Sequence, residues 1–143
     1  ILPYKTDAGS GSLEQMALAE FCKENFNSHV KTLKIKLQKK SEAICNALDK
    51  YFGSSAEYKK PDGGIFVWVD MHKKVDTSRL YELALKDGVA INPGNEWSIN
   101  KSGRHKMRLC FGNPSIKEID EGIKRLAIIC RKEFGIPTKI ANL

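Results

Sequence analysis

The residue in this sequence whose type and setting best suit ligand binding is Arg108, within the stretch KMRLCFG of residues 106–112. A guanidinium on rigid backbone presents a planar fork of N–H donors, which is what two-pronged recognition of a carboxylate requires. Alternating apolar residues predict a strand over residues 107–111 that points Arg108 and Cys110 to the same face. The strand pattern alone also fits an exposed arginine, or one paired with an acidic neighbour.

The elements around this strand are predicted by caps, turns and periodicity. Ser115 and Glu118 have the spacing of a capping box, and Gly135 with Pro137 ends the helix that they begin. The residues expected to face inward from this helix are Ile116, Ile119, Ile123, Leu126, Ala127, Cys130 and Phe134.

The preceding segment alternates between strand and helix signals. After an extended piece from Ala56, the turn at 61–64 leads into a strand over 65–71. A helix capped within 76–78 and running through Lys86 follows. Residues 89–91 are expected to be a short buried strand, which 92–94 breaks before a loop over 95–105. The predicted fold class is α+β, a mainly antiparallel small sheet with helices packed on one face.

Two helices are expected before this layer. Ser12 and Gln15 have capping-box spacing for a helix to about residue 26, and Ser28 is expected to cap a longer helix ended by Gly53. That second helix would be about 36 Å long at about 1.5 Å per residue, which favours a link between two bodies. We therefore expect a remnant of a large domain over 1–27, a connecting helix over 28–53 and a small domain over 54–143.

Composition restricts the function classes. The chain has 143 residues, 41% of them hydrophobic, and 24 basic against 17 acidic residues give a net charge of +7. A basic chain suits nucleic acid or other anionic partners. However, the densest lysine run, over 31–40, contains Leu33, Ile35 and Leu37 and no aromatic residue, so we interpret it as a solvated helix face.

The cysteines and histidines lack the spacing of metal or redox sites. The four cysteines are far apart in the sequence, which favours buried free thiols in a reducing, cytoplasmic compartment. No apolar run has the length of a membrane span and no signal peptide is recognisable. The sequence begins at Ile1 and has no initiator methionine, which suggests a fragment of a longer polypeptide.

Four short motifs occur in an ordered series over residues 61–68, 88–94, 108–111 and 119–126. They read P-x-G-G-x-F-x-W, G-V-x-x-x-P-G, R-L-x-F and I-x-x-G-I-x-x-L. This series resembles the C-terminal part of class I/II, fold-type I pyridoxal-phosphate-dependent aminotransferases, in particular the aminoadipate, kynurenine and aromatic aminotransferase branch. The resemblance covers nearly the whole chain and is most secure over 56–134.

The resemblance implies that Arg108 binds the α-carboxylate of an amino acid or 2-oxo acid substrate, and that Gly94 and Trp97 belong to an active-site loop. It also implies a pyridoxal phosphate cofactor and a homodimer for the full-length enzyme. The family's lysine, which forms the Schiff base with the cofactor, is not recognisable here; the surroundings of Lys5 do not match it. This chain alone is therefore expected to lack catalytic and cofactor-binding residues, to bind no pyridoxal phosphate and to be inactive.

Some alternatives remain open at this point. The chain could be a non-catalytic basic module for nucleic acid or another anionic partner, although we expect no nucleic acid and no membrane partner. It could also complete an enzyme together with a separate large-domain chain. Trp97 could be a loop anchor that covers the core instead of a residue at the substrate.

Overall fold

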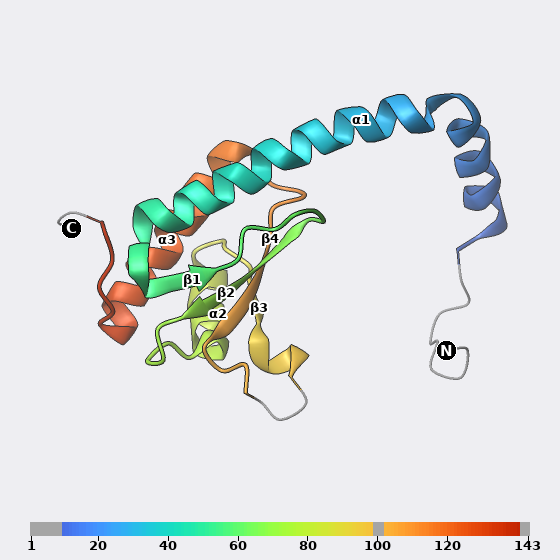
Figure 1. The fold of residues 1–143 in the computed structure, drawn as a ribbon. Coiled ribbons are helices and arrows are strands. Elements are labelled where there is room, and N and C mark those ends of the chain that lie inside the picture. The colour runs from blue at the N-terminus through green and yellow to red at the C-terminus, as the bar shows by residue number, and fades with distance from the viewer. Residues whose placement is uncertain (1–9, 99–101, 141–143) are drawn as a thin grey trace. The chain divides into compact units, whose positions relative to one another are not determined.

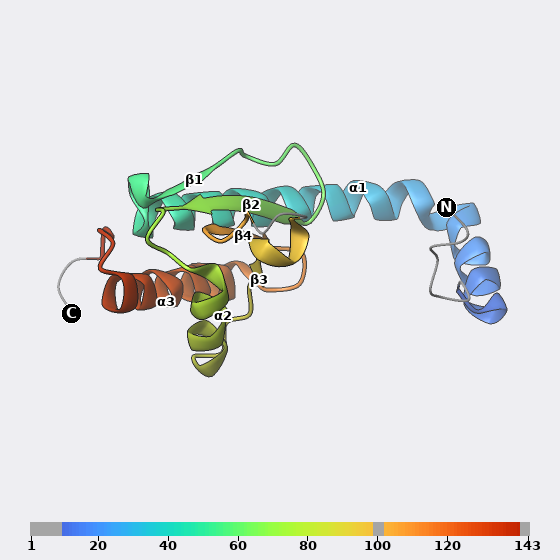
Figure 2. The same cartoon turned by 90° about the horizontal axis from the view of Figure 1, so that it is seen from below.

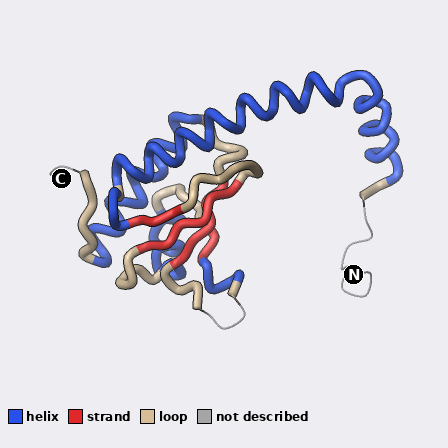
Figure 3. Tube along the Cα trace, viewed as in Figure 1, coloured by secondary structure: helices blue, strands red, loops and turns tan. Residues whose placement is uncertain are grey.

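The computed structural model of this chain describes residues 10–98 and 102–140. It divides into two compact units, Ile1–Ile35 and Lys36–Leu143. The elements, which Figures 1 and 3 show, are α1 (Ser12–Tyr51), a short 3-10 helix (Gly53–Ser55), β1 (Ala56–Tyr58), β2 (Phe66–Met71), α2 (Thr77–Lys86), β3 (Asn92–Pro93), the 3-10 helix η3 (Gly94–Trp97), β4 (Lys106–Cys110) and α3 (Ile116–Phe134).

The described strands form one antiparallel sheet in the order β1-β2-β4-β3. Because side chains alternate along a strand, β2 and β4 each divide into an inward and an outward set. Val67, Val69, Met107 and Leu109 are inward and almost fully buried. The opposite set lies on what we call the open face of the sheet, namely Phe66, Trp68, Arg108 and Cys110.

The core lies between the inward face of the sheet and the helices of the second unit. Leu48 of α1, Leu80 of α2 and Leu126 of α3 are at most 1% exposed and belong to one hydrophobic cluster with the strands. Figure 2 shows α2 and α3 on the same side of the sheet. The predicted α+β layer, with helices on one face of a mainly antiparallel sheet, is confirmed.

The predicted caps around α2 and α3 are present. The Asp76 side chain accepts hydrogen bonds from the backbone N–H groups of Ser78 and Arg79. Ser115 and Glu118 form the complete capping box, whose hydrogen bonds lower the pKa of the Glu118 carboxyl. Gly135 ends α3 with φ of 62°, in the left-handed region where glycine has no side-chain penalty. These local signals fix where both helices begin and where α3 ends.

The prediction of two helices before residue 53 was wrong. The structure has one continuous helix, α1, from Ser12 to Tyr51. The Ser28 hydroxyl donates to the Asn25 carbonyl within the helix, so this serine bonds to the preceding turn instead of starting a new helix. The predicted capping box of Ser12 also fails, because Ser12 is already helical and the Gln15 side chain donates to the Ser10 carbonyl.

Other boundaries and burial predictions also need correction. The strand expected at 89–91 lies at Asn92–Pro93, because the pairing with β4 begins only there. Ile116 is 51% exposed, since it lies in the first turn of α3 and points away from the core. The four cysteines are free, but Cys110 is exposed because it lies on the open face, and Cys22 is only half-buried.

An α3 carboxylate joins α3 to the end of α1 and makes stability depend on pH. Asp120 accepts hydrogen bonds from Lys50 at 3.1 Å and from the Tyr51 hydroxyl at 2.9 Å. Lys50 first, and then Tyr51, hold the pKa of Asp120 below its ordinary value of 3.8. A lowered folded-state pKa stabilises the protein above the ordinary value, and this contribution is lost as pH falls through the folded-state pKa.

We therefore predict that Asp120→Asn lowers the free energy of unfolding at pH 7 by less than about 1 kcal/mol, because the groups are largely exposed. The difference in the free energy of unfolding between wild type and Asp120→Asn should shrink below about pH 4, because the wild-type carboxylate also loses its charge there. Denaturant unfolding at pH 7 and pH 3 measures both values. Glu121→Gln, whose ion pair with Arg125 stays within α3, is the control with little expected effect. An Asp120→Asn deficit that is the same at both pH values would contradict the assignment.

Candidate functional site

The register of the sheet places Arg108 at the centre of the open face. Arg108 lies directly opposite Trp68 on β2 and opposite Asn92 on β3. Phe66 is one pair further along β2, opposite Cys110. Directly opposite and diagonal side chains on the same face of a sheet are within reach of one another. The strand pairing therefore brings residues 66, 68 and 92 around the arginine.

The Arg108 guanidinium contacts two aromatic rings and has few hydrogen bonds. Its Cζ lies 4.1 Å from the centre of the Phe66 ring and 3.8 Å from that of Trp97. Its Nη2 donates to Asn92 Oδ1 at 3.5 Å, which is the outer limit of a hydrogen bond. The buried Nε has no hydrogen-bond partner among the described residues. Most of the donor capacity of this arginine is therefore available to a ligand.

The acidic residue nearest along the open face does not neutralise Arg108. Asp70 is paired with Lys106 and lies 3.3 Å from His105. Within the described part of the chain, the ion pairs do not include Arg108. A half-buried cation with aromatic neighbours and unused N–H groups is suited to bind an anion, and a planar carboxylate matches its fork.

Close backbone contact holds the base of the loop that carries Trp97. A Cβ on Gly94 would lie 2.5 Å from the Gly103 carbonyl oxygen and 2.7 Å from that of Lys106. The Thr77 backbone N–H and hydroxyl both donate to the Arg104 carbonyl, which ties the end of the loop to α2. Residues 99–101 of the predicted 95–105 loop lie outside the described residues. The short helix η3 is therefore anchored at its start.

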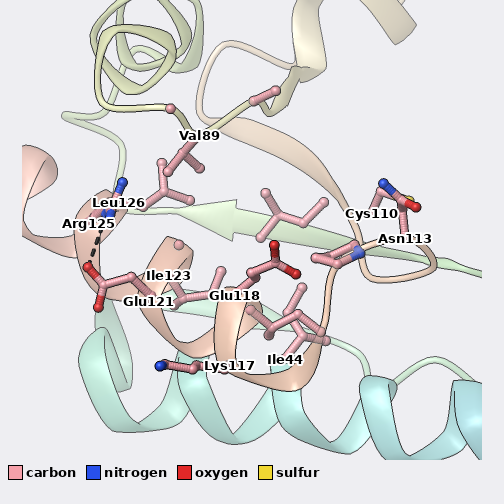
Figure 4. A pocket seen from close by; sticks show the side chains of 16 residues that line it. Ile44, Val89, Cys110, Asn113, Lys117, Glu118, Glu121, Ile123, Arg125 and Leu126 are labelled. Atoms are coloured by element: carbon pink, nitrogen blue, oxygen red, sulfur yellow. Dashed lines mark hydrogen bonds and ion pairs between the residues drawn. The ribbon is translucent and has the colours of Figure 1, made fainter.

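A separate cavity of about 850 Å³ lies between α3, residues 88–90 and the end of β4. Figure 4 shows Arg125 and Glu121 paired at one side of it, with Asn113 and Cys110 at the other. Arg108 does not line this cavity. We place the candidate site at Arg108 because the unpartnered N–H donor is there, whereas Arg125 already donates to Glu121 and to the Asp87 carbonyl.

Sequence reasoning found part of this arrangement. Arg108 and Trp97 do come together, with the ring over the guanidinium. Gly94 is buried at the loop base, so it shapes the loop. Phe66 and Asn92 were missed as neighbours of the arginine, because only the pairing of β4 with both β2 and β3 reveals them. The period of two along the strand predicted over 65–71 is the sequence signal that could have found Phe66.

Comparison with known proteins shows the family of this chain. The sequence matches the family described as aminotransferase class I and II over residues 4–126. This chain belongs to that family. It is 31% identical over 120 residues to 2-aminoadipate transaminase of Thermus thermophilus, covering 84% of this chain and 30% of the relative. It is also 32% identical over 132 residues to YisV of Bacillus subtilis, an uncharacterized HTH-type transcriptional regulator, covering 92% of this chain and 27% of that protein.

A solved member of the family has the same fold. The α-aminoadipate aminotransferase LysN of Thermus thermophilus aligns with a TM-score of 0.81 and 29% identity, covering 88% of this chain and 32% of LysN. That structure is complexed with N-(5'-phosphopyridoxyl)-L-leucine. This chain thus spans less than a third of the length of each of these three proteins.

Pyridoxal phosphate is the cofactor of the family, and the described residues around Arg108 do not fit it. The lysine on the same strand and face, Lys106, is paired with Asp70 instead of being free for a Schiff base. The described residues also form no cluster suited to a metal ion, and no helix among them is long and apolar enough to cross a membrane. The chemistry of the side chains around Arg108 suits an anion.

The close contact at Gly94 gives a prediction about loop geometry. Gly94→Ala should lower the free energy of unfolding by about 1–3 kcal/mol, because backbone atoms must move to admit the Cβ. It should also change tryptophan fluorescence, since Trp97 follows three residues later. Gly63→Ala is the matched control, because an added Cβ there meets nothing within 4 Å. Equal melting temperatures and spectra for both variants would contradict the close contact.

Proposed function

We propose that this chain is the carboxylate-binding part of an aminotransferase that transfers an amino group between an amino acid and a 2-oxo acid. The observation that carries the proposal is the Arg108 guanidinium, which is half-buried between two rings with a buried Nε that has no partner among the described residues. Both substrate classes have a carboxylate next to the reacting carbon. An arginine that binds this carboxylate would serve both halves of the reaction.

The role of Arg108 would be to orient the substrate. Two parallel N–H···O bonds fix the carboxylate in the plane of the guanidinium, so the neighbouring carbon is held in one direction. The rings of Phe66 and Trp97 keep water from the faces of the guanidinium, which strengthens the charge interaction. The carboxylate does not itself react, so the free energy of its binding would be used to position the neighbouring carbon.

The remaining parts of the enzyme would come from the rest of the full-length protein. We propose that residues 1–27 belong to the large cofactor-binding domain, that 28–53 connect the domains and that 54–143 form the small domain. Residues 1–9 lie outside the described residues. The lysine and the cofactor would be held elsewhere in a homodimeric, cytoplasmic enzyme, so this chain alone would be inactive.

A substitution of Arg108 in the full-length protein tests the proposal. Arg108→Ala should raise the KM for the amino acid at least about 100-fold, because a charge-assisted pair of hydrogen bonds is lost. Cofactor absorbance should be unchanged. Arg125→Ala removes an arginine from the separate cavity and is the matched control, with little expected change in KM. Unchanged kinetics for Arg108→Ala would reject the proposal, and a loss for Arg125→Ala alone would move the site to the other cavity.

A second candidate function is supported by the similarity to YisV. A protein named as a transcriptional regulator is 32% identical over 132 residues. In this candidate, the same Arg108 site would bind a carboxylate as an effector, and the full-length protein would bind DNA.

A non-catalytic basic module that binds nucleic acid or another anionic partner is less well supported. Several basic side chains already form local ion pairs, namely Lys23, Lys50, Arg79, Arg104, Lys106 and Arg125.

Two assays on the full-length protein separate these candidates. The aminotransferase proposal predicts conversion of a 2-oxo acid to an amino acid in the presence of pyridoxal phosphate. The regulator proposal predicts salt-sensitive DNA binding that an amino acid alters, without multiple turnovers. Turnover without DNA binding supports the first. DNA binding without turnover supports the second.

A further inference from the structure

The two rings at Arg108 come from opposite sides of β4. Phe66 belongs to β2 and Trp97 to η3, which directly follows β3. In the strand order, β4 lies between β2 and β3, so the rings approach from both neighbouring segments. Phe66 is half-buried on a regular strand. Trp97 is different, because it lies outside the sheet and its position depends on the loop.

The contacts of Trp97 indicate what its ring does. It is 53% exposed, so it does not anchor the loop by filling the core. Its ring lies 3.8 Å from Arg108 Cζ and 6.4 Å from the Trp68 ring in an edge-to-face arrangement. Stacking on an arginine is a favourable use of an otherwise exposed indole. Of these two contacts of the Trp97 ring, the one with the Arg108 guanidinium is the closer.

Other forces that could orient the guanidinium are weak. The hydrogen bond to Asn92 is 3.5 Å long, Nε has no partner, and within the described ranges no carboxylate pairs with Arg108. We therefore treat the contacts with the two rings as the main constraint on the guanidinium plane. The N–H groups of a guanidinium lie in its plane, so rings that lie over its Cζ leave these groups open to a ligand along the edge.

We propose that Trp97 is a positioning residue, which holds the plane of Arg108 so that a carboxylate binds along its N–H edge. This inference rests on the proposed function, because it concerns the same carboxylate. A guanidinium already held in one orientation loses less conformational freedom when the ligand binds. Removing the indole face should therefore weaken substrate binding more than it slows the chemical step.

Three variants of the full-length protein test this role. Trp97→Leu keeps an apolar side chain but removes the aromatic face, and it should raise the KM for the amino acid about fivefold while kcat changes less than about twofold. Trp97→Phe restores an aromatic face and should return KM to within about twofold of wild type. Leu85→Ala alters an α2 side chain of similar exposure, 52%, and should change neither value. Wild-type KM in Trp97→Leu would overturn the proposal.

A double-mutant cycle shows whether Trp97 acts through Arg108. In an Arg108→Lys background, Trp97→Leu should raise KM less than about twofold, because the planar group that it orients is gone. An undiminished effect in that background would assign Trp97 to direct substrate contact and overturn the positioning role. If Arg108→Lys alone leaves KM unchanged, the proposed function fails. If it raises KM and Trp97→Leu does not, only the positioning role fails.

Discussion

The constraint on which the site depends is that only one face of the β2–β4 pair is covered. Val67, Val69 and Leu109 must be buried against the helices, and the period of two along a strand then sends every second residue to the other face. A shift of one residue in register would place Arg108 in the core. The burial of these apolar side chains therefore determines that Arg108 lies on the open face, although they do not contact a ligand there.

The same pairing determines the electrostatics of the open face. Charges of opposite sign face each other at one cross-strand pair, where Lys106 lies opposite Asp70. At the next pair along this face, Arg108 lies opposite Trp68, which carries no charge. The acidic group is thus already engaged, and the arginine is surrounded by rings and an amide. An unpaired cation in a partly desolvated setting is costly unless it binds an anion, so this arrangement is explained better by a ligand than by stability.

Much of the fold could be predicted from the sequence because its signals are local. The caps at Asp76 and Ser115 and the left-handed Gly135 each act within a few residues, and the alternation around Arg108 identified its face. The errors came from tertiary effects. Ser28 does not interrupt α1, since its hydroxyl bonds back to Asn25, and the short β3 lies where β4 offers a partner. Phe66 and Asn92 reach Arg108 only through strand pairing, which a single sequence does not specify.

The location of the site also explains why the larger cavity is not the best indication of function. That cavity of about 850 Å³ is lined by α3 and the segment before β3, where Arg125 already has protein partners. The open face is a surface rather than an enclosed cavity, yet it holds the buried Nε that lacks a partner among the described residues. A sheet face that carries one half-buried cation suits a segment that supplies part of a site. In the function that we propose, the rest of the site would approach that face, which is consistent with a chain that spans less than a third of the length of YisV, 2-aminoadipate transaminase and LysN.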